Sequence, residues 1–394
     1  MDEKKVLLVS HVSGFVPQFE MNDVRILQDM GYEVHYASNY NTPSYGTDNE
    51  RLKGTGIVQH QVDFVRSPWN VPVNLKAYRQ LKQLMRDYNF ALVHCHNPMS
   101  AALTRIAAKM TGTGPVLYTA HGFHFYQGAP LHMWLLYGTM ELLLSFLTDQ
   151  QICINKEDYL FAKHFFHSRR VDYIPGVGID VERIKRTTAT ADRAKKRQEL
   201  GIPLDSVVLV TAGEMIPRKN QKIILQALAE LKKQSSDVPP EEKAFGSLRY
   251  FCIVCGHGEL KEELEVLAHG LGIENDVLFP GYRQDLWEIY AASDIFVFPS
   301  LQEGLPAALL EAMASGLPVV CSDIRGSNEL IVNGRGGFRV PPRALGEYTA
   351  RLHALSVSRE KWERMGEWNR QTAEKYKEEN TIKIMKDIYR RWLK

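Results

Sequence analysis

Residues 291–311 read AASDIFVFPSLQEGLPAALLE, and this stretch decides the fold. It begins with an apolar run of strand length, rich in branched and aromatic residues, and passes through a Gly-Leu-Pro step into a helical pattern. Pro306 stands where a helix would begin, because proline is favoured in a first helical turn. The stretch therefore predicts a strand, a loop and a helix, with Glu303 in the loop and Glu311 in the second helical turn.

The two glutamates of this stretch stand eight positions apart. In open α/β sheets, ligands bind beyond the carboxyl ends of the strands, beside helix N-termini whose free N–H groups favour anions. A carboxylate in that place would repel a phosphate, so we expect Glu303 and Glu311 to accept hydrogen bonds from paired hydroxyls, such as a ribose diol or a sugar ring. Gly304 permits close approach of the backbone. The pattern favours a sugar nucleotide as ligand.

The size of the chain indicates two domains, because 394 residues with 44% hydrophobic content exceed what one core usually supports. A net charge of +2 gives no electrostatic argument for a nucleic-acid partner. Five cysteines stand in apolar, strand-like contexts, which is typical of reduced core residues in a cytosolic protein. Cys252 and Cys255 form a CxxC, but a strand sends positions three apart to opposite faces, which is unfavourable for a metal or redox pair.

The sequence predicts neither a signal peptide nor a membrane-spanning helix. The charged start MDEKK leads directly into the strand pattern VLLVS, so we expect no signal peptide. The most apolar stretch, residues 131–147, is marginal against the roughly 20 residues of a spanning helix, and His132 and Glu141 interrupt it. We expect a buried or interfacial helix there, in a cytoplasmic protein.

Strand and helix patterns alternate along the chain. In the first half, strand runs such as VLLVS, EVHYAS, ALVHC and VLYTA alternate with helical patterns at residues 19–30, 75–88, 101–109 and 158–166. The Pro- and Gly-rich stretch IPGVGIDVERI indicates a crossover between domains, and a second alternating series follows it. A polar insert at residues 235–247 predicts an exposed loop. Alternation of this kind predicts parallel sheets covered on both faces.

We therefore predict an α/β protein with two Rossmann-like, doubly wound domains that face one another across a cleft, where the ligand would sit. The first domain would span residues 1–176 and the second residues 177–377. The last helices, residues 361–394, carry apolar and aromatic residues at near-helical spacing and would pack along both domains. The final helix, about 378–394, would pack back on the first domain.

The segment GEMIPRKN predicts an anion site. Gly213 ends the strand VVLVTAG, Arg218 and Lys219 follow in the loop, and a helix begins near Asn220. Cations beside a helix N-terminus suit a diphosphate whose charge increases as its bond to a sugar breaks. Solvated loop charges are the alternative. At the same sheet edge, the backbone of Tyr282 and Arg283 could read a nucleotide base, although an ordinary loop explains them equally well.

Histidines follow two strands of the first domain. His121 and His124 come after VLYTA with Gly122 between them, and imidazole can donate to a phosphate or a sugar hydroxyl, or move a proton. For His94 and His96 we favour a structural role. We find no carboxylate or third ligand at metal spacing beside these histidines, so we predict no metal.

The first strand-to-helix loop contains Gly14, which permits close approach of the backbone and is a candidate donor contact. This loop lacks GxGxxG, which counts against an NAD enzyme.

These motifs together resemble glycosyltransferase family 4, a retaining family with the GT-B fold. The resemblance runs along essentially the whole chain, and its most specific parts are EGLPAALLEAMASGLPVV, GEMIPRKN and AHGFHF. It implies that Glu311 holds the ribose hydroxyls, Glu303 contacts the transferred sugar, Lys219 balances the diphosphate and His121 lines the sugar. The backbone of Gly304 and Leu305 would approach the sugar and the phosphate.

One departure from the family concerns the phosphate loop, where this chain has Gly213, Glu214 and Met215 in place of the common Gly-Arg-Leu. Arg218 is the candidate substitute for the missing arginine. The Glu form of the loop resembles members that build bacterial capsular and exopolysaccharide repeat units. It implies a UDP-sugar donor of a hexose or N-acetylhexosamine, a lipid-diphosphate-linked saccharide acceptor, and retention of configuration with neither metal nor other cofactor.

A lipid-linked acceptor implies peripheral contact with the cytoplasmic face of the inner membrane. The helix NLKAYRQLKQLMRDY places Lys76, Arg79, Lys82 and Arg86 at helical spacing beside an apolar stripe, so these four are candidates for docking on anionic lipid. A solvated face over a core stripe explains the same pattern.

Two other functions fit the same fold. One is a sugar-nucleotide epimerase or hydrolase, which would act on free UDP-sugar alone. The other is a membrane-associated scaffold that has lost catalysis. Retention of Lys219, Glu303, Glu311 and His121 argues against the scaffold, and the altered Gly213–Glu214 step keeps it open as an alternative.

Overall fold

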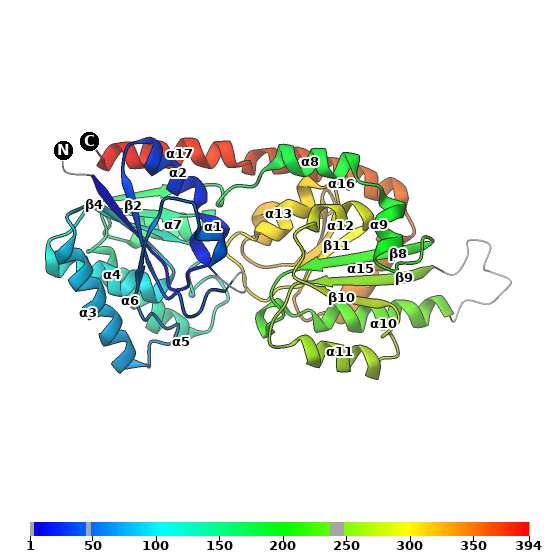
Figure 1. Cartoon of the computed structure of the whole chain (residues 1–394). Helices are drawn as coiled ribbons and strands as arrows, with labels where there is room; N and C mark the ends of the chain where they lie inside the picture. Colours follow the sequence, from blue (N-terminus) through cyan, green and yellow to red (C-terminus); the bar gives the residue numbers. More distant parts are fainter. Residues whose placement is uncertain (1–3, 45–48, 237–247, 394) are drawn as a thin grey trace. The chain divides into compact units, whose positions relative to one another are not determined.

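The structure is a computed structural model that describes residues 4–44, 49–236 and 248–393. It contains two compact units, and the chain passes from the first to the second after Val177 and returns to the first at Glu379 (Figure 1). Most of the predicted loop at residues 235–247 lies outside the described residues.

The first unit is built on a seven-stranded parallel sheet of order β3-β2-β1-β4-β5-β6-β7. Its strands are β1 Lys5–Val9, β2 Glu33–Ser38, β3 Val58–Gln61, β4 Phe90–His96, β5 Val116–Ala120, β6 Gln150–Cys153 and β7 Arg170–Tyr173. Its helices are α1 Phe15–Phe19, α2 Met21–Asp29, α3 Val71–Asp87, α4 Pro98–Thr111, α5 Leu131–Met133, the π-helical turn Trp134–Gly138, α6 Thr139–Ser145, α7 Lys156–Phe165 and α17 Glu378–Trp392, with a 3-10 turn at Glu50–Leu52.

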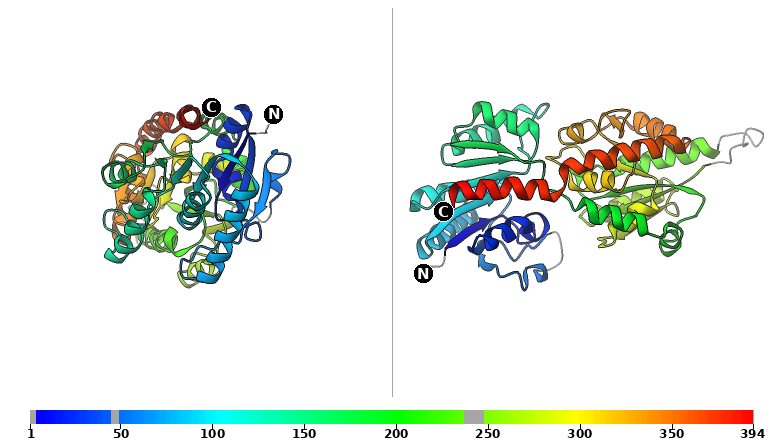
Figure 2. Two further views of the ribbon diagram at one scale, coloured as in Figure 1. Left: turned by 90° about the vertical axis from the view of Figure 1, so that its left-hand side faces the viewer. Right: turned by 90° about the horizontal axis from the view of Figure 1, so that it is seen from above.

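Helices cover both faces of this sheet. Buried residues of α3, α4 and α7 form one core cluster with the strands, and the helix through residues 131–145 packs against it with Trp134, Tyr137 and Leu142. On the other face, α17 contacts α2 through a hydrogen bond between Tyr389 and Asp23. The view from above in Figure 2 shows α17, in red, lying along the first unit.

The second unit has a six-stranded parallel sheet of order β10-β9-β8-β11-β12-β13. Its strands are β8 Ser206–Ala212, β9 Arg249–Cys255, β10 Val277–Gly281, β11 Ile295–Phe298, β12 Val319–Ser322 and β13 Gly337–Val340. Its helices are α8 Val181–Thr190, α9 Arg193–Glu199, α10 Lys222–Ser236, α11 Lys261–Gly270, α12 Leu286–Ala292, α13 Ala307–Ala314, α14 Ser327–Leu330, α15 Leu345–Ser356 and α16 Arg359–Ala373, with 3-10 turns at Pro217–Lys219 and Glu374–Tyr376.

The predicted α/β class with two Rossmann-like domains is confirmed, because both sheets are parallel and strands alternate with helices throughout. Runs of β-branched residues form central strands such as β8, which is buried along its whole length. All five cysteines are free and buried, which confirms their role as core residues. In each sheet the strand order reverses beside the first strand, at β1/β4 and at β8/β11, and such switch points are where open α/β sheets bind ligands.

The apolar stretch at residues 131–147 forms a continuous helical segment with a π-helical turn in its middle. Among the described residues, no helix is long and apolar enough to cross a membrane.

Candidate functional site

The switch point of the second unit brings the predicted anion loop and the first glutamate together. Arg218 and Lys219 lie in the 3-10 turn Pro217–Lys219, which follows β8, and Glu303 lies in the loop that follows β11. The strands β8 and β11 are adjacent, so their carboxyl ends share one edge. The helix α10 begins at Lys222, two residues later than the sequence pattern indicates.

Two cations hold the side chain of Glu303. Lys219 Nζ lies 2.7 Å from Glu303 Oε1, and Arg218 Nη1 lies 3.1 Å from the same oxygen. Arg218 also donates to the carbonyl oxygen of Gln302 at 2.8 Å. Burial alone would raise the pKa of Glu303, but Lys219 and Arg218 outweigh it and hold that pKa below its ordinary value. Glu303 is therefore a carboxylate at neutral pH, fixed beside a strong positive charge.

A third cation, Arg325, belongs to this site and was not predicted. It follows β12, is buried, and donates from Nε to the carbonyl oxygen of Glu303 at 3.1 Å. The next residue, Gly326, has a φ of 83°, and a Cβ on it would lie 2.4 Å from the carbonyl oxygen of Gly304. The β12 loop thus packs directly on the Glu303 loop. Ligand residues of open α/β sheets follow the strands, and this signal could have indicated Arg325, because CSDIRG comes directly after the apolar run PVV.

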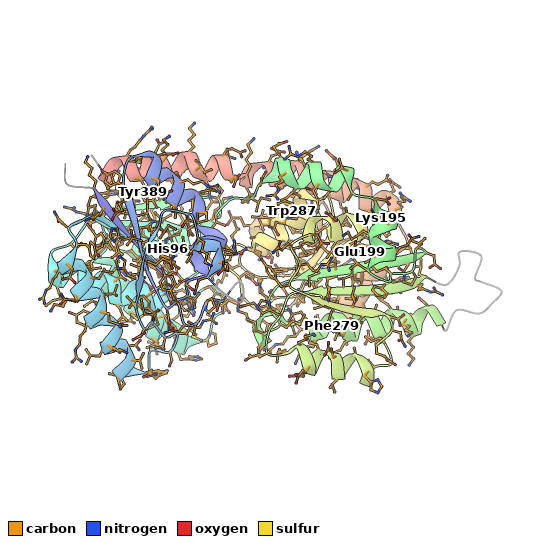
Figure 3. All side chains as sticks on the ribbon, viewed as in Figure 1. His96, Lys195, Glu199, Phe279, Trp287 and Tyr389 are labelled. Carbon is orange, nitrogen blue, oxygen red and sulfur yellow. The ribbon has the colours of Figure 1, made fainter. Side chains whose placement is uncertain are left out.

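Glu311 lies in the second turn of α13, as predicted. It is partly buried, and burial raises its pKa to about 7, against which a hydrogen bond from Trp287 acts. Trp287 is labelled in Figure 3. Glu311 can therefore change between a hydrogen-bond donor and a carboxylate acceptor near neutral pH.

The other residues predicted to contact the nucleotide-sugar differ in burial and in their partners. A Cβ on Gly213 would lie 3.5 Å from the Lys219 side chain, which places that glycine against the anion loop. Leu305 is buried, whereas Tyr282 is exposed. The guanidinium of Arg283 is paired with Asp285 at 2.6 Å and Glu199 at 3.2 Å, so the side chain is bound to its own unit and only its backbone stays a candidate.

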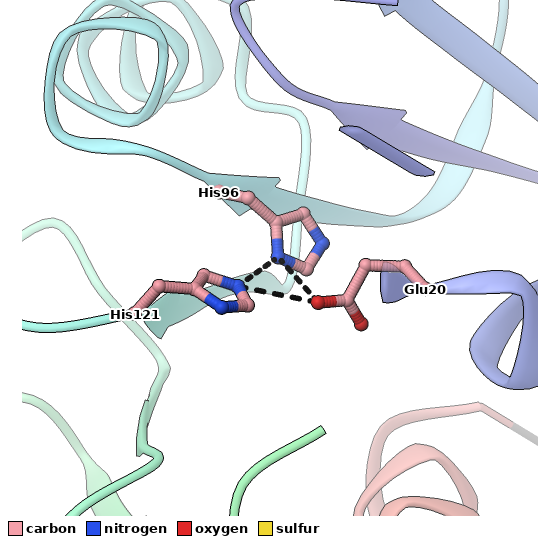
Figure 4. Close-up of side chains that lie close together, drawn as sticks. All are labelled: Glu20, His96 and His121. Atoms are coloured by element: carbon pink, nitrogen blue, oxygen red, sulfur yellow. Dashed lines mark hydrogen bonds and ion pairs between the residues drawn. The ribbon is translucent and has the colours of Figure 1, made fainter. Parts of the chain in front are cut away.

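Three polar side chains meet at the switch point of the first unit, and we call them the Glu20 cluster: Glu20, His96 and His121 (Figure 4). His96 Nδ1 and His121 Nε2 are hydrogen-bonded at 3.2 Å. Glu20 Oε1 lies 3.2 Å from His121 Nε2 and 3.7 Å from His96 Nδ1. Within the described residues, Glu20 Oε1 is buried and has no hydrogen-bond partner. Glu20, which stands between α1 and α2 after the first strand, was not among the predicted site residues.

A second row of side chains supports this cluster. The hydroxyl of Tyr389 lies 2.7 Å from His94 Nδ1, and His94 Nε2 lies 2.7 Å from Thr119 Oγ1. Tyr389 donates to Asp23 Oδ2, and Asp23 shares a hydrogen bond with Glu20. His94 is thus structural, as predicted, whereas His96 points its Nδ1 at His121. His96 and Tyr389 are both labelled in Figure 3.

Burial sets the protonation of the cluster. It raises the pKa of Glu20 to about 8 and lowers that of His121 to about 4. It also lowers the pKa of His96 well below the usual value. At neutral pH the two imidazoles are therefore neutral and Glu20 carries a proton.

The prediction that no carboxylate lies beside the histidines was wrong, because Glu20 comes from a distant part of the sequence. The three ligand atoms lie within 4.8 Å of one another. Tetrahedral zinc, with bonds of about 2.0–2.1 Å, separates its ligand atoms by roughly 3.3 Å, so the cluster could hold a divalent ion. A proton on Glu20 accounts for the same contacts without one. The unpartnered Glu20 Oε1 can equally receive a hydroxyl of a bound sugar.

The other predictions for the first unit turn out differently. The N–H of Gly14 donates to Pro43 O at 2.7 Å, and a Cβ on Gly14 would lie 1.9 Å from Ser44 O. The backbone of Gly14 therefore lies close to its own chain. Its N–H is already hydrogen-bonded and is not available to a nucleotide-sugar in this structure. His124 lies against Tyr137, with ring centroids 4.8 Å apart.

The basic residues of α3 face outward. Lys76 pairs with Asp63 at 2.6 Å, and Arg79 and Arg86 are exposed. The predicted apolar stripe is divided, because Leu81 and Met85 are buried while Leu75 is exposed.

Comparison with known proteins agrees with the geometry of both units. The family model described as "Glycosyl transferases group 1" matches residues 192–372, and the model described as "Glycosyl transferase 4-like" matches residues 5–155. The EpsD protein of Bacillus subtilis (strain 168) is 35% identical over 390 residues, which cover 98% of this chain and 96% of EpsD. A UDP-Gal:α-D-GlcNAc-diphosphoundecaprenol α-1,3-galactosyltransferase of Escherichia coli is 30% identical over 68% of this chain and 66% of its own length.

Solved structures show the same fold at low identity. Anabaena HepE in complex with UDP-glucose superposes with a TM-score of 0.73 at 18% identity, covering 98% of this chain and 99% of HepE. WaaG, a glycosyltransferase involved in lipopolysaccharide biosynthesis, superposes with a TM-score of 0.73 at 19% identity, covering 97% of this chain and 99% of WaaG. With two matched family models and a relative that is similar along nearly its whole length, this chain belongs to glycosyltransferase family 4 and has the GT-B fold.

Proposed function

We propose that this glycosyltransferase transfers a hexose or N-acetylhexosamine from a UDP-sugar to a lipid-diphosphate-linked saccharide, with retention of configuration, in capsule or exopolysaccharide synthesis. The observation that carries the proposal is the arrangement of Lys219 and Arg218 around Glu303, with Glu311 on the helix that follows.

Lys219 and Arg218 are suited to the diphosphate. An ammonium has three donor hydrogens, so Lys219 can keep its bond to Glu303 Oε1 and still donate to a phosphate oxygen. Because both cations are already fixed, they need no rearrangement when negative charge develops on the leaving UDP. In this proposal the protein cations replace the metal ion, and Arg218 replaces the arginine that the family commonly has after the glycine.

The two glutamates are suited to hydroxyl groups. Glu303 accepts hydroxyl hydrogens from the transferred sugar, and the backbone of Gly304 and Leu305 lies beside it. Glu311 accepts hydrogen bonds from the ribose hydroxyls once it is ionised. Both carboxylates position the donor, and neither is a covalent nucleophile.

In the first unit we assign His121 to the transferred sugar. Its neutral imidazole can exchange hydrogen bonds with a hydroxyl, and a hydroxyl there would also supply Glu20 Oε1 with its missing donor.

The acceptor class and the location are suggested by the relatives. The Escherichia coli enzyme is named for a diphosphoundecaprenol-linked acceptor and a UDP-galactose donor. An acceptor of that class is anchored in the inner membrane, so we propose that the enzyme works at its cytoplasmic face. Lys76, Arg79, Lys82 and Arg86 of α3 remain candidates for contact with anionic lipid.

The test uses purified protein, a panel of UDP- and GDP-sugars, and a diphosphate-linked saccharide on a short lipid. We expect transfer from one UDP-sugar, with the product identified by mass spectrometry and its anomeric configuration by NMR. If GDP-sugars, and no UDP-sugar, raised the thermal unfolding temperature of the protein, the donor assignment would be overturned. An inverted product would overturn retention, and turnover of the UDP-sugar without acceptor would favour the epimerase or hydrolase.

A further inference from the structure

Exposed large apolar side chains are unevenly distributed between the two units. Of those on the described residues, twelve lie in the first unit and five in the second. All twelve lie between Trp69 and Phe165, in and around α3 to α7. The helices α2 and α17, on the opposite face of the same sheet, have none. Figure 1 shows α2 and α17 above this sheet and α4, α5 and α6 below it.

The densest group lies on one helix. Leu131, Leu135, Leu136, Leu143 and Phe146 are between 39% and 72% exposed, and we call them the apolar helix face. With the exposed Thr139, four of them continue a spacing of four, four, four and three residues, which keeps them on one side of a helix. The π-helical turn Trp134–Gly138 has more residues per turn than an α-helix, so it keeps a spacing of four in line.

The opposite side of this helix explains why the apolar helix face cannot turn inward. Its only acidic residue, Glu141, is buried and pairs with Arg105 of α4 at 2.9 Å. Trp134 packs in the core against Phe161 of α7, with ring centroids 5.5 Å apart. The polar pair and the aromatic contacts fix the rotation of the helix, and the leucines are left toward solvent.

Exposed cations outnumber acidic residues in the segments next to the apolar helix face. Within residues 101–111, 131–147 and 160–170 the buried Glu141 is the only acidic residue, whereas Lys109, Lys163, Arg169 and Arg170 are exposed. Arg169 is paired with Asp149 at 3.0 Å. The two regions are in direct contact, because the rings of Phe146 and His167 stack with centroids 4.1 Å apart. An apolar surface with a basic border complements an anionic bilayer, which accepts leucine and phenylalanine below its negative head groups.

We propose that the apolar helix face is the surface by which this enzyme docks on an anionic phospholipid bilayer, with Lys163 and Arg170 contacting the head groups. This deepens the membrane contact proposed above and rests on it, and it places the docking surface on the helix at 131–146 in addition to the basic residues of α3. A second copy of the chain is a less suitable partner, because self-association through this face would bring the same cations together.

The experiment is vesicle flotation of the full-length protein without donor or acceptor, using phosphatidylglycerol-containing and pure phosphatidylcholine vesicles. The variant is Leu135→Ser/Leu143→Ser/Phe146→Ser. We expect the wild type to float with the anionic vesicles and the variant to lose at least about tenfold in partitioning. The matched control is Leu204→Ser/Val266→Ser/Val357→Ser, which removes three comparably exposed apolar residues of the second unit and should float like the wild type.

A charge variant tests the basic border. Lys163→Glu/Arg170→Glu should weaken flotation with anionic vesicles and leave the small binding to neutral vesicles unchanged, and added salt should reduce the difference. Both variants should keep wild-type thermal unfolding, because the altered side chains are exposed.

Equal flotation of the triple variant and the wild type would overturn the proposal, as would equal loss in the control. If light scattering showed a dimer for the wild type and a monomer for the triple variant, and both floated equally, the apolar helix face would be assigned to self-association instead. The proposed function is tested separately. If flotation depended on the apolar helix face but the protein transferred no sugar from any UDP donor, the docking surface would be supported and the proposed activity would be contradicted.

Discussion

The hydroxyl of Tyr389 donates to Asp23 Oδ2 at 2.9 Å, although 366 positions of sequence separate the two residues. The same hydroxyl lies 2.7 Å from His94 Nδ1. Through Asp23, which shares a hydrogen bond with Glu20, the C-terminal helix α17 takes part in positioning the Glu20 cluster. The helix α17 therefore helps to position His121 through these hydrogen bonds.

Tyr389→Phe should lower the free energy of unfolding by about 1–3 kcal/mol, because Asp23 and His94 lose a buried partner. It should also reduce turnover, since Glu20 and His121 lose their support. Denaturant unfolding and steady-state kinetics measure the two effects. The control is Trp392→Phe on the same helix, which removes a bond of 3.2 Å from Trp392 Nε1 to Gln150 and leaves the cluster intact. Equal kinetics in both variants would contradict the positioning role.

Lys219→Ala should reduce kcat/KM about 10²–10³-fold, because a preorganised donor to the leaving diphosphate is lost. Arg218→Ala should weaken UDP binding, measured by calorimetry. Lys222→Ala is the control, since Lys222 is an exposed cation at the start of α10. If Arg218→Ala binds UDP as tightly as the wild type, Arg218 does not replace the missing arginine.

The affinity for UDP should depend on the ionisation of Glu311. With a pKa of about 7, its carboxyl is increasingly neutral as the pH falls below 7, and a neutral acid accepts fewer hydrogen bonds from the ribose hydroxyls. Wild-type affinity should therefore fall more steeply on acidification than that of Glu311→Gln, which has no such titration. Calorimetry from about pH 5.5 to about pH 8.5 compares them, and the variant also corrects for the ionisation of UDP itself. Parallel curves would contradict the assignment.

Glu20 should make the protein less stable as the pH rises. Its folded pKa, raised to about 8, means that folding favours the protonated form, so the contribution is complete below the unfolded pKa of about 4.5 and is lost as the pH rises through 8. The loss reaches at most about 1.4 kcal/mol per pH unit. Glu20→Gln should lose less stability between about pH 6 and about pH 8 in denaturant unfolding. A variant with the wild-type slope would show that Glu20 is already ionised in the folded protein.

Removal of metal should leave turnover unchanged, because Lys219 and Arg218 supply the charge that a metal would supply to the diphosphate. The measurement is transfer activity after chelation, with the zinc content determined by mass spectrometry. A loss that zinc restores in the wild type, together with loss of zinc from Glu20→Gln, would instead show that the Glu20 cluster holds an ion.

The sequence predicted what local pattern controls. The strands follow from runs such as VVLVTAG, and the position of Glu311 follows from Pro306 at the start of α13. Residues that stand in one loop after one strand, such as Gly213 and Lys219, were predicted to lie together because they are close in the sequence.

What the sequence did not predict depends on strands that are distant along the chain. Glu20 meets His96 and His121 only because β1, β4 and β5 end at one edge of the sheet. Arg325 reaches the Glu303 loop in the same way. The rotation of the helix at 131–146 depends on the pairing of Glu141 with Arg105, and an apolar run does not reveal which of its leucines remain exposed.

The return of the chain to its first unit has a consequence for biosynthesis. Domains generally fold as units during translation, in order from the N-terminus. Here the first sheet cannot receive α17 until the ribosome has finished the second unit, so the Asp23 and His94 side chains wait without Tyr389 while more than half of the protein is made. An N-terminal fragment ending at Val177 should be poorly stable when expressed alone, and supplying the α17 peptide in trans should rescue it.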